Sequence, residues 1–82
     1  MLKGYQLIIT DQNVFDGDFS SEVGDVYMKR DDAVEELKRK LEHFKEEWEL
    51  DDKDIDAYDG FARIHTDGSR VKLDVKPVEI HE

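Results

Sequence analysis

The sequence predicts a single α+β domain over residues 1–82, a four-stranded, largely antiparallel sheet with one helix on one face, in the order strand, strand, helix, strand, strand. Three observations predict this class. β-branched and aromatic residues fill the beginning of the chain, an apolar stripe at helical spacing occupies its middle, and two alternating segments flank an Asp-Gly pair near its end. A chain of 82 residues, 38% of them hydrophobic, supplies one core.

The first part of the chain is expected to hold two strands and a long connection. Residues 4–10 place apolar side chains at every second position, which predicts a strand, and residues 23–29 are typical of a second one. Between them, residues 11–21 are rich in Asp, Asn, Gly and Ser. This composition favours an ordered loop held in place by Phe15 and Phe19.

A helix is expected to begin at Asp32. Asp32 followed three residues later by Glu35 is a capping-box pattern, with Asp in the place of Ser or Thr. From there, apolar side chains recur at spacings of three and four and form one narrow stripe: Val34, Leu37, Leu41, Phe44 and Trp48. We expect this stripe to lie on the sheet. Pairing with a second helix in a homodimer is the alternative.

Residues 60–76 form a predicted hairpin. Asp67-Gly68 separates two alternating segments, and this pair favours a two-residue type I′ turn in which both central residues have positive φ. Such a turn pairs Ile64 with Val71 and places one set of apolar side chains on the core face: Ala62, Ile64, Val71, Leu73 and Val75. Pro77 lacks an amide donor and is expected to end strand pairing.

The charge balance excludes several classes of function. Acids outnumber bases 22 to 12, which gives a net charge of −10 and should repel nucleic acids and anionic membranes. There is no cysteine, and no apolar run is long enough to span a membrane. We therefore expect a cytoplasmic protein without a cofactor, existing as a monomer or homodimer, that neither binds nucleic acid directly nor inserts into a membrane.

The acidic excess near the end of the helix is the first candidate site. Residues 42–59 hold nine acids against two lysines, partly where the helix dipole is negative and acids are unfavourable. A solvated surface is one explanation. A surface that binds a basic partner protein, or that mimics a nucleic-acid backbone and inhibits a nucleic-acid-binding protein, is the other. The candidate residues are Glu42, Glu46, Glu49, Asp51, Asp52, Asp54, Asp56 and Asp59.

The outer face of the predicted hairpin is the alternative site, which we call the basic patch. It consists of Phe61, Arg63, His65, Arg70 and Lys72. The hairpin register puts Arg63 opposite Lys72, and like charges directly opposite each other destabilise a strand pair. Either neighbouring acids such as Asp74 neutralise these cations, or an anionic partner does.

Neither a metal site nor a catalytic site is predicted. Asp52, Asp54 and Asp56 match the start of an EF-hand loop, but Ala57 replaces its glycine and Arg63 replaces its bidentate Glu. The acids lie in polar runs that water should reach, so no carboxyl group is marked as a catalytic acid. We expect a protein-interaction module without enzymatic activity. Weak divalent-metal binding or a small enzyme is the alternative.

One segment resembles a pattern in small acidic bacterial and prophage proteins of unassigned function. Residues 24–37, Gly-Asp-Val-Tyr-Met-Lys-Arg-Asp-Asp-Ala-Val-Glu-Glu-Leu, look like a junction in which a strand ending in Val-Tyr leads into a helix opening with Ala and Leu. The resemblance covers 14 of the 82 residues. It implies a phage or prophage accessory protein, and it carries no functional residue over.

Overall fold

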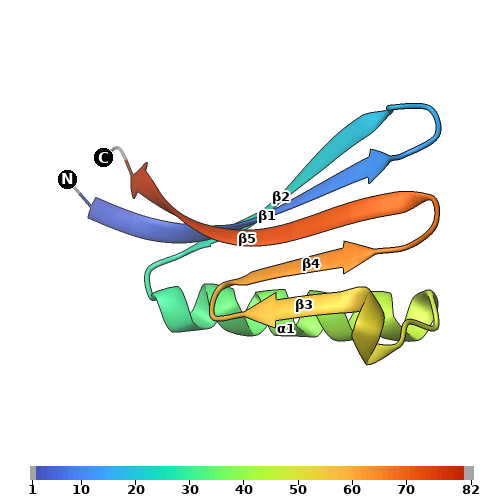
Figure 1. The fold of residues 1–82 in the computed structure, drawn as a ribbon. Coiled ribbons are helices and arrows are strands. Elements are labelled where there is room, and N and C mark those ends of the chain that lie inside the picture. The colour runs from blue at the N-terminus through green and yellow to red at the C-terminus, as the bar shows by residue number, and fades with distance from the viewer. Residues whose placement is uncertain (1, 81–82) are drawn as a thin grey trace.

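A computed structural model describes residues 2–80 and shows one helix packed against a five-stranded antiparallel sheet (Figure 1). The α+β class is confirmed, but the prediction of four strands is wrong. In chain order the elements are β1 (Leu2–Asn13), β2 (Phe19–Tyr27), α1 (Arg30–Glu47), the 3-10 turn η1 (Asp52–Asp54), β3 (Ile55–Tyr58), β4 (Phe61–His65) and β5 (Ser69–Ile80). The strand order across the sheet is β2-β1-β5-β4-β3.

The two central strands, β1 and β5, pair along their whole length, from Leu2 opposite Ile80 to Asn13 opposite Ser69. The prediction that Pro77 ends strand pairing is therefore wrong. Amide groups of alternate residues point to the same side of a strand, and the Val75 N–H donates to Gly60 O on the β4 side. The Pro77 nitrogen points to that same side, beyond the start of β4, where no donor is required.

The loop expected at residues 11–21 is instead the turn of a β-hairpin. β1 continues to Asn13 and β2 begins at Phe19. The Asn13 side chain accepts the N–H groups of Phe15 and Asp16, and Gly17 adopts a φ of 72°, so the polar residues build a tight turn. The expected anchoring is wrong as well, because Phe15 is 79% exposed and Phe19 67% exposed.

Helix α1 packs on the sheet through the predicted stripe. Val34 and Leu37 are buried, and the remaining three apolar residues are partly buried against the core: Leu41, Phe44 and Trp48. The start at Asp32 is wrong. The helix begins at Arg30 and Lys29 is its N-cap without a side-chain hydrogen bond, so Asp31 and Asp32 lie in the first turn, where the helix dipole favours acids.

The hairpin of β4 and β5 has the predicted register, with Ile64 opposite Val71 and Arg63 opposite Lys72. The predicted type I′ turn is wrong, because neither Asp67 nor Gly68 has a positive φ. Contacts with the neighbouring β1–β2 turn and with Thr66 account for the difference. Gly68 O accepts the Val14 N–H at 3.0 Å, and the Thr66 hydroxyl accepts the Ser69 N–H at 3.0 Å.

The missed strand is β3, which lies at the sheet edge within the acidic excess. Its sequence, Ile-Asp-Ala-Tyr, contains one strongly apolar core residue, Ile55, which pairs with Ile64 of β4. A four-residue strand between acids carries too little alternation to be recognised.

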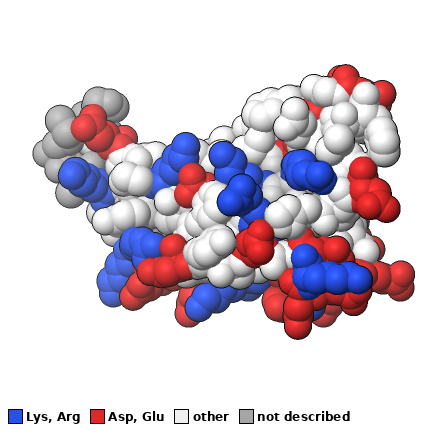
Figure 2. Space-filling model, viewed as in Figure 1, with Lys and Arg blue, Asp and Glu red and all other residues white. Residues whose placement is uncertain are grey.

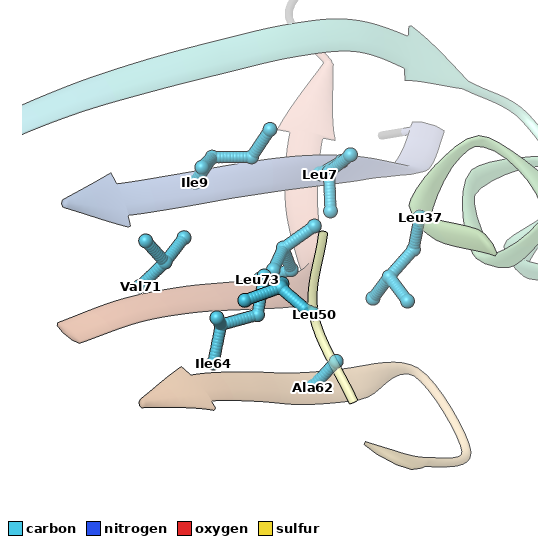
Figure 3. Close-up of a cluster of buried hydrophobic side chains, with 8 residues drawn as sticks. All are labelled: Leu7, Ile9, Leu37, Leu50, Ala62, Ile64, Val71 and Leu73. Carbon is cyan, nitrogen blue, oxygen red and sulfur yellow. The ribbon is translucent and has the colours of Figure 1, made fainter. Parts of the chain in front are cut away.

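The single core lies between α1 and one face of the sheet (Figure 3). Glu49 has a φ of 52° just after the helix, which turns the chain back so that Leu50 joins the core. The core residues are Leu7, Ile9, Leu37, Leu50, Ala62, Ile64, Val71 and Leu73. The opposite face of the sheet has no helix against it, and we call it the helix-free face.

Candidate functional site

The basic patch lies on the helix-free face. Side chains alternate along a strand, so the residues between the buried Ala62, Ile64, Val71 and Leu73 point away from α1. Figure 2 shows Lys and Arg side chains gathered over the middle of the sheet, with acids more frequent at the level of the helix. This face therefore carries a group of cations in a chain whose net charge is −10.

All five residues of the basic patch line one shallow concavity of about 510 Å³. Thr10 and Gln12 of β1 and Phe19 of β2 complete its wall. Sequence reasoning missed these three because it could not place β1 next to β5. The alternation along β1 signals that Thr10 and Gln12 lie opposite the core face, but only the strand order shows which residues they adjoin.

The cations of the concavity are not neutralised by neighbouring acids. Asp56 lies opposite Arg63 in the β3–β4 register, yet its Oδ2 is 2.8 Å from His65 Nε2. The Asp74 carboxylate is 3.8 Å from Lys76 Nζ. Within residues 2–80, no carboxylate comes within 4.0 Å of the side-chain nitrogens of three exposed cations: Arg63, Arg70 and Lys72.

Two of these cations are held by uncharged groups. The Arg63 guanidinium lies 5.7 Å from the centre of the Phe61 ring, at the range of a cation–π contact. Arg70 donates to the backbone oxygens of Thr66 and Ser69, at 2.6 and 3.1 Å. These contacts fix the direction of the side chains and leave their charge uncompensated.

The acidic residues predicted as a partner site do not form one face. Asp59 pairs with Arg30 at the start of α1, at 3.3 Å, whereas Asp52 pairs with Lys45 near its end, at 3.1 Å. The Asp52 carboxylate raises the pKa of the Lys45 ammonium by accepting its hydrogen bond. Asp56 belongs to the helix-free face.

The other acids of residues 42–59 also lie in different environments. Asp54 accepts the backbone N–H of Asp51 within η1. Three exposed carboxylates remain near the end of α1: Glu42, Glu46 and Glu49. The EF-hand-like acids are likewise engaged with different partners, and the described part of the chain contains no cluster of three metal-ligating side chains.

One buried acid, Glu36, was not predicted from the sequence. Glu36 of α1 is 9% exposed, and its Oε2 has no hydrogen-bond partner. It lies against Gly24 of β2, where an added Cβ would come within 2.8 Å of Glu36 Oε1. The Glu36 carboxylate, as a hydrogen-bond acceptor and as a negative charge, raises the pKa of the Tyr27 hydroxyl. Its position beside Leu37 in the helical stripe was the available signal.

No family model, no curated protein and no solved structure matches this chain. Among the residues described, no helix is long and apolar enough to cross a membrane.

Proposed function

We propose that this chain is a cytoplasmic, non-enzymatic protein-interaction module that binds an acidic segment of a partner protein on the helix-free face. One observation carries the proposal. The five residues of the basic patch line a single concavity, and among residues 2–80 no carboxylate forms an ion pair with Arg63, Arg70 or Lys72. The chain has 22 acids, so internal neutralisation was available in its composition and is not used.

The local energetics favour an anionic ligand. Arg63 and Lys72 lie directly opposite each other, and such a like-charged pair destabilises a hairpin by a few tenths of a kcal/mol or more. A partner carboxylate placed between them would replace repulsion with two attractions. Phe61 and Phe19 at the rim add apolar surface, so an acidic segment that also carries apolar side chains fits best.

A protein segment fits this surface better than a nucleic acid. The acids Asp16 and Asp18 lie in the β1–β2 turn, next to Phe19 of the concavity, and would repel a long polyanion. A short acidic segment can contact Arg63 and Lys72 without coming close to the acids of the β1–β2 turn. The division of the acidic block between opposite ends of α1 argues against the nucleic-acid mimic, which needs its carboxylates on one face.

The proposal assigns no catalytic residue. His65 and Asp56 are both more than a third exposed and pair with each other, and Asp74 lies against Lys76. These groups face solvent, and the proposal gives them no catalytic role.

A peptide titration with matched charge variants tests the proposal. The probe is a fluorescent peptide of alternating Glu and Val, and the test variant is Arg63→Gln with Lys72→Gln. The control variant, Lys29→Gln with Lys38→Gln, removes the same charge from exposed positions that do not line the concavity. We expect at least a tenfold loss of affinity in the test variant and less than a twofold loss in the control.

Two outcomes would overturn the proposal. Equal affinities of both variants for the peptide would mean that the basic patch does not bind it. Tighter binding of a single-stranded oligonucleotide than of the peptide, lost in the test variant, would reassign the face to nucleic acid. Unfolding midpoints of the two variants serve as the check on folding. The test variant should be at least as stable as the control, because it also removes the repulsion between Arg63 and Lys72.

A further inference from the structure

The exposed apolar surface of this protein is concentrated in one segment. Among residues 3–80, seven large hydrophobic side chains are exposed, and all except Tyr58 lie between residues 14 and 28. They are Val14, Phe15, Phe19, Val23, Val26 and Met28. Three of these side chains, Phe19, Val23 and Val26, belong to β2, so the exposed apolar residues concentrate along this strand and its two ends.

That segment contains the long edge strand of the sheet. β2 has nine residues and pairs only with β1, whereas the opposite edge, β3, has four. In Figure 1, β2 forms the upper edge of the sheet and rises away from α1 toward its hairpin turn. β2 contains no Lys, Arg or Pro, the residues that commonly prevent a sheet edge from pairing with another strand.

A β-bulge aligns the apolar side chains of this edge. The register shifts between Gln6 and Ile8, so that Val23 lies opposite Ile8 and Val26 lies opposite Gln6. Ile8 and Gln6 share the helix-free face, which places Val23 and Val26 on that same face although they are three residues apart. Phe19, opposite Gln12, belongs to it as well.

The other face of the β2 edge is acidic. Glu22 pairs with Ile9 and therefore projects to the opposite side from Val23. Residues 11–25 contain five acids and no base. A strand lying beside β2 would meet apolar side chains on one face and negative charge on the other.

The hydrogen-bonding groups of the edge point outward at alternate residues. The Val75–Gly60 bond fixes which amide groups of β5 point toward β4. The continuous β1–β5 register, and the β1–β2 register from Ile8 to Gln12 beyond the bulge, carry this alternation to residues 19–23 of β2. The N–H groups of Ser20 and Glu22 point toward β1. Those of Ser21 and Val23 point out of the sheet, toward an added strand.

We propose that β2 is a docking edge for an extended segment of a partner protein in which apolar residues alternate with Lys or Arg. The segment adds a sixth strand to the sheet, with its apolar side chains beside Val23 and Val26 and its cations beside Glu22. Backbone hydrogen bonds supply affinity, and the alternation supplies specificity. This site contains none of the five residues of the basic patch, shares only Phe19 with the wall of the concavity, and has the opposite charge preference.

The experiment uses a nine-residue peptide of alternating Val and Lys, titrated into the full chain. The test variant is Ser21→Pro, which removes an outward N–H and leaves the pairing with β1 intact. The matched control is Ser21→Ala, which keeps that N–H. We expect at least a tenfold loss of affinity in Ser21→Pro, no more than a twofold change in Ser21→Ala, and at least tenfold weaker binding of a peptide of alternating Val and Glu.

Three results would overturn the proposal. One is equal binding of the Val-Lys peptide to Ser21→Pro and Ser21→Ala, with both folded by circular dichroism. Another is equal affinity for the Val-Lys and Val-Glu peptides. The third is a dimeric mass in ultracentrifugation that Ser21→Pro converts to a monomer, which would assign the edge to a second copy of the chain. The Arg63→Gln and Lys72→Gln variant should bind the Val-Lys peptide normally, which separates this site from the basic patch.

Discussion

Glu36 brings a carboxylate into the contact between α1 and β2. Its exposed fraction is 9%, and one of its oxygens lacks a hydrogen-bond partner. Burial of such a group without full compensation is unfavourable, since the charge loses its hydration. The absence of a side chain at Gly24 provides the space that the carboxylate occupies. The contact between Glu36 and Gly24 therefore determines how closely α1 approaches β2.

Glu36→Gln should stabilise the fold. The substitution keeps the shape of the side chain and removes the charge, so the free energy of unfolding should rise by about 1 kcal/mol at neutral pH. Glu35→Gln, at an exposed neighbouring position, should change it by less than about 0.5 kcal/mol. Denaturant unfolding measures both. A loss of stability in Glu36→Gln would show that the carboxylate is needed where it lies.

Tyr27 should report on the same contact in an alkaline titration. The Glu36 carboxylate raises the pKa of the Tyr27 hydroxyl above its ordinary value of 10.0. The folded state therefore holds this proton more tightly than the unfolded state. The resulting stability is present below pH 10 and is lost as the pH rises through the folded-state pKa. In an NMR titration, Glu36→Gln should lower the Tyr27 pKa, and Glu35→Gln should leave it unchanged.

At the scale of elements, the helix and the β4–β5 hairpin both contribute to the core. Leu37 is 3% exposed and contacts the core formed by Ala62, Ile64 and Leu73. Alternation along the hairpin strands, and spacings of three and four along the helix, place the apolar residues on one side of each element. This is why both elements could be recognised from the sequence.

A pair of neighbouring substitutions on α1 tests this packing. Leu37→Asp places an unpaired charge in the core and should lower the free energy of unfolding by about 3–5 kcal/mol. Lys38→Asp, one residue further on the exposed side, should lower it by less than about 1 kcal/mol. If thermal or denaturant unfolding gives the same midpoint for both variants, the stripe does not face the sheet.

The edge strand β2 should show alternating amide protection. The N–H groups of Ser20 and Glu22 bond to β1 and should exchange slowly, whereas those of Ser21 and Val23 face solvent and should exchange fast. Hydrogen exchange followed by NMR resolves the four amides. Uniformly fast exchange across residues 19–23 would contradict the hairpin and favour a loop.

The features that were not predicted from the sequence were missed for physical reasons. The start of β2, Phe-Ser-Ser-Glu, is exposed on both faces, so no burial pattern distinguishes it from a loop. The helix start at Arg30 has no capping side chain, which made Asp32 the stronger signal. The basic patch was recognised because it lies on one hairpin. Thr10, Gln12 and Phe19 come from other strands, and only the tertiary strand order joins them to it.

At the scale of the whole molecule, positive charge is concentrated on part of one face of a domain that is acidic overall. A net charge of −10 hides a face where three cations lie without carboxylate partners, on the far side of the sheet from α1. Exposed charges are screened over about 8 Å at physiological salt. The acids of the helix therefore add little to the field above Arg63 and Lys72. Asp56, opposite Arg63, and Asp74, two residues from Lys72 on the same face, are the acids that reduce this field.

The most direct test of this account is an NMR titration of the isotopically labelled chain with the Glu-Val peptide at 50 and 300 mM salt. The account predicts chemical-shift changes confined to the strands that line the concavity, largest at residues 61–65 and 70–72. The affinity should be at least fivefold lower at the higher salt concentration, because screening weakens the attraction. Shift changes centred on α1 or on β2, or an affinity independent of salt, would contradict it.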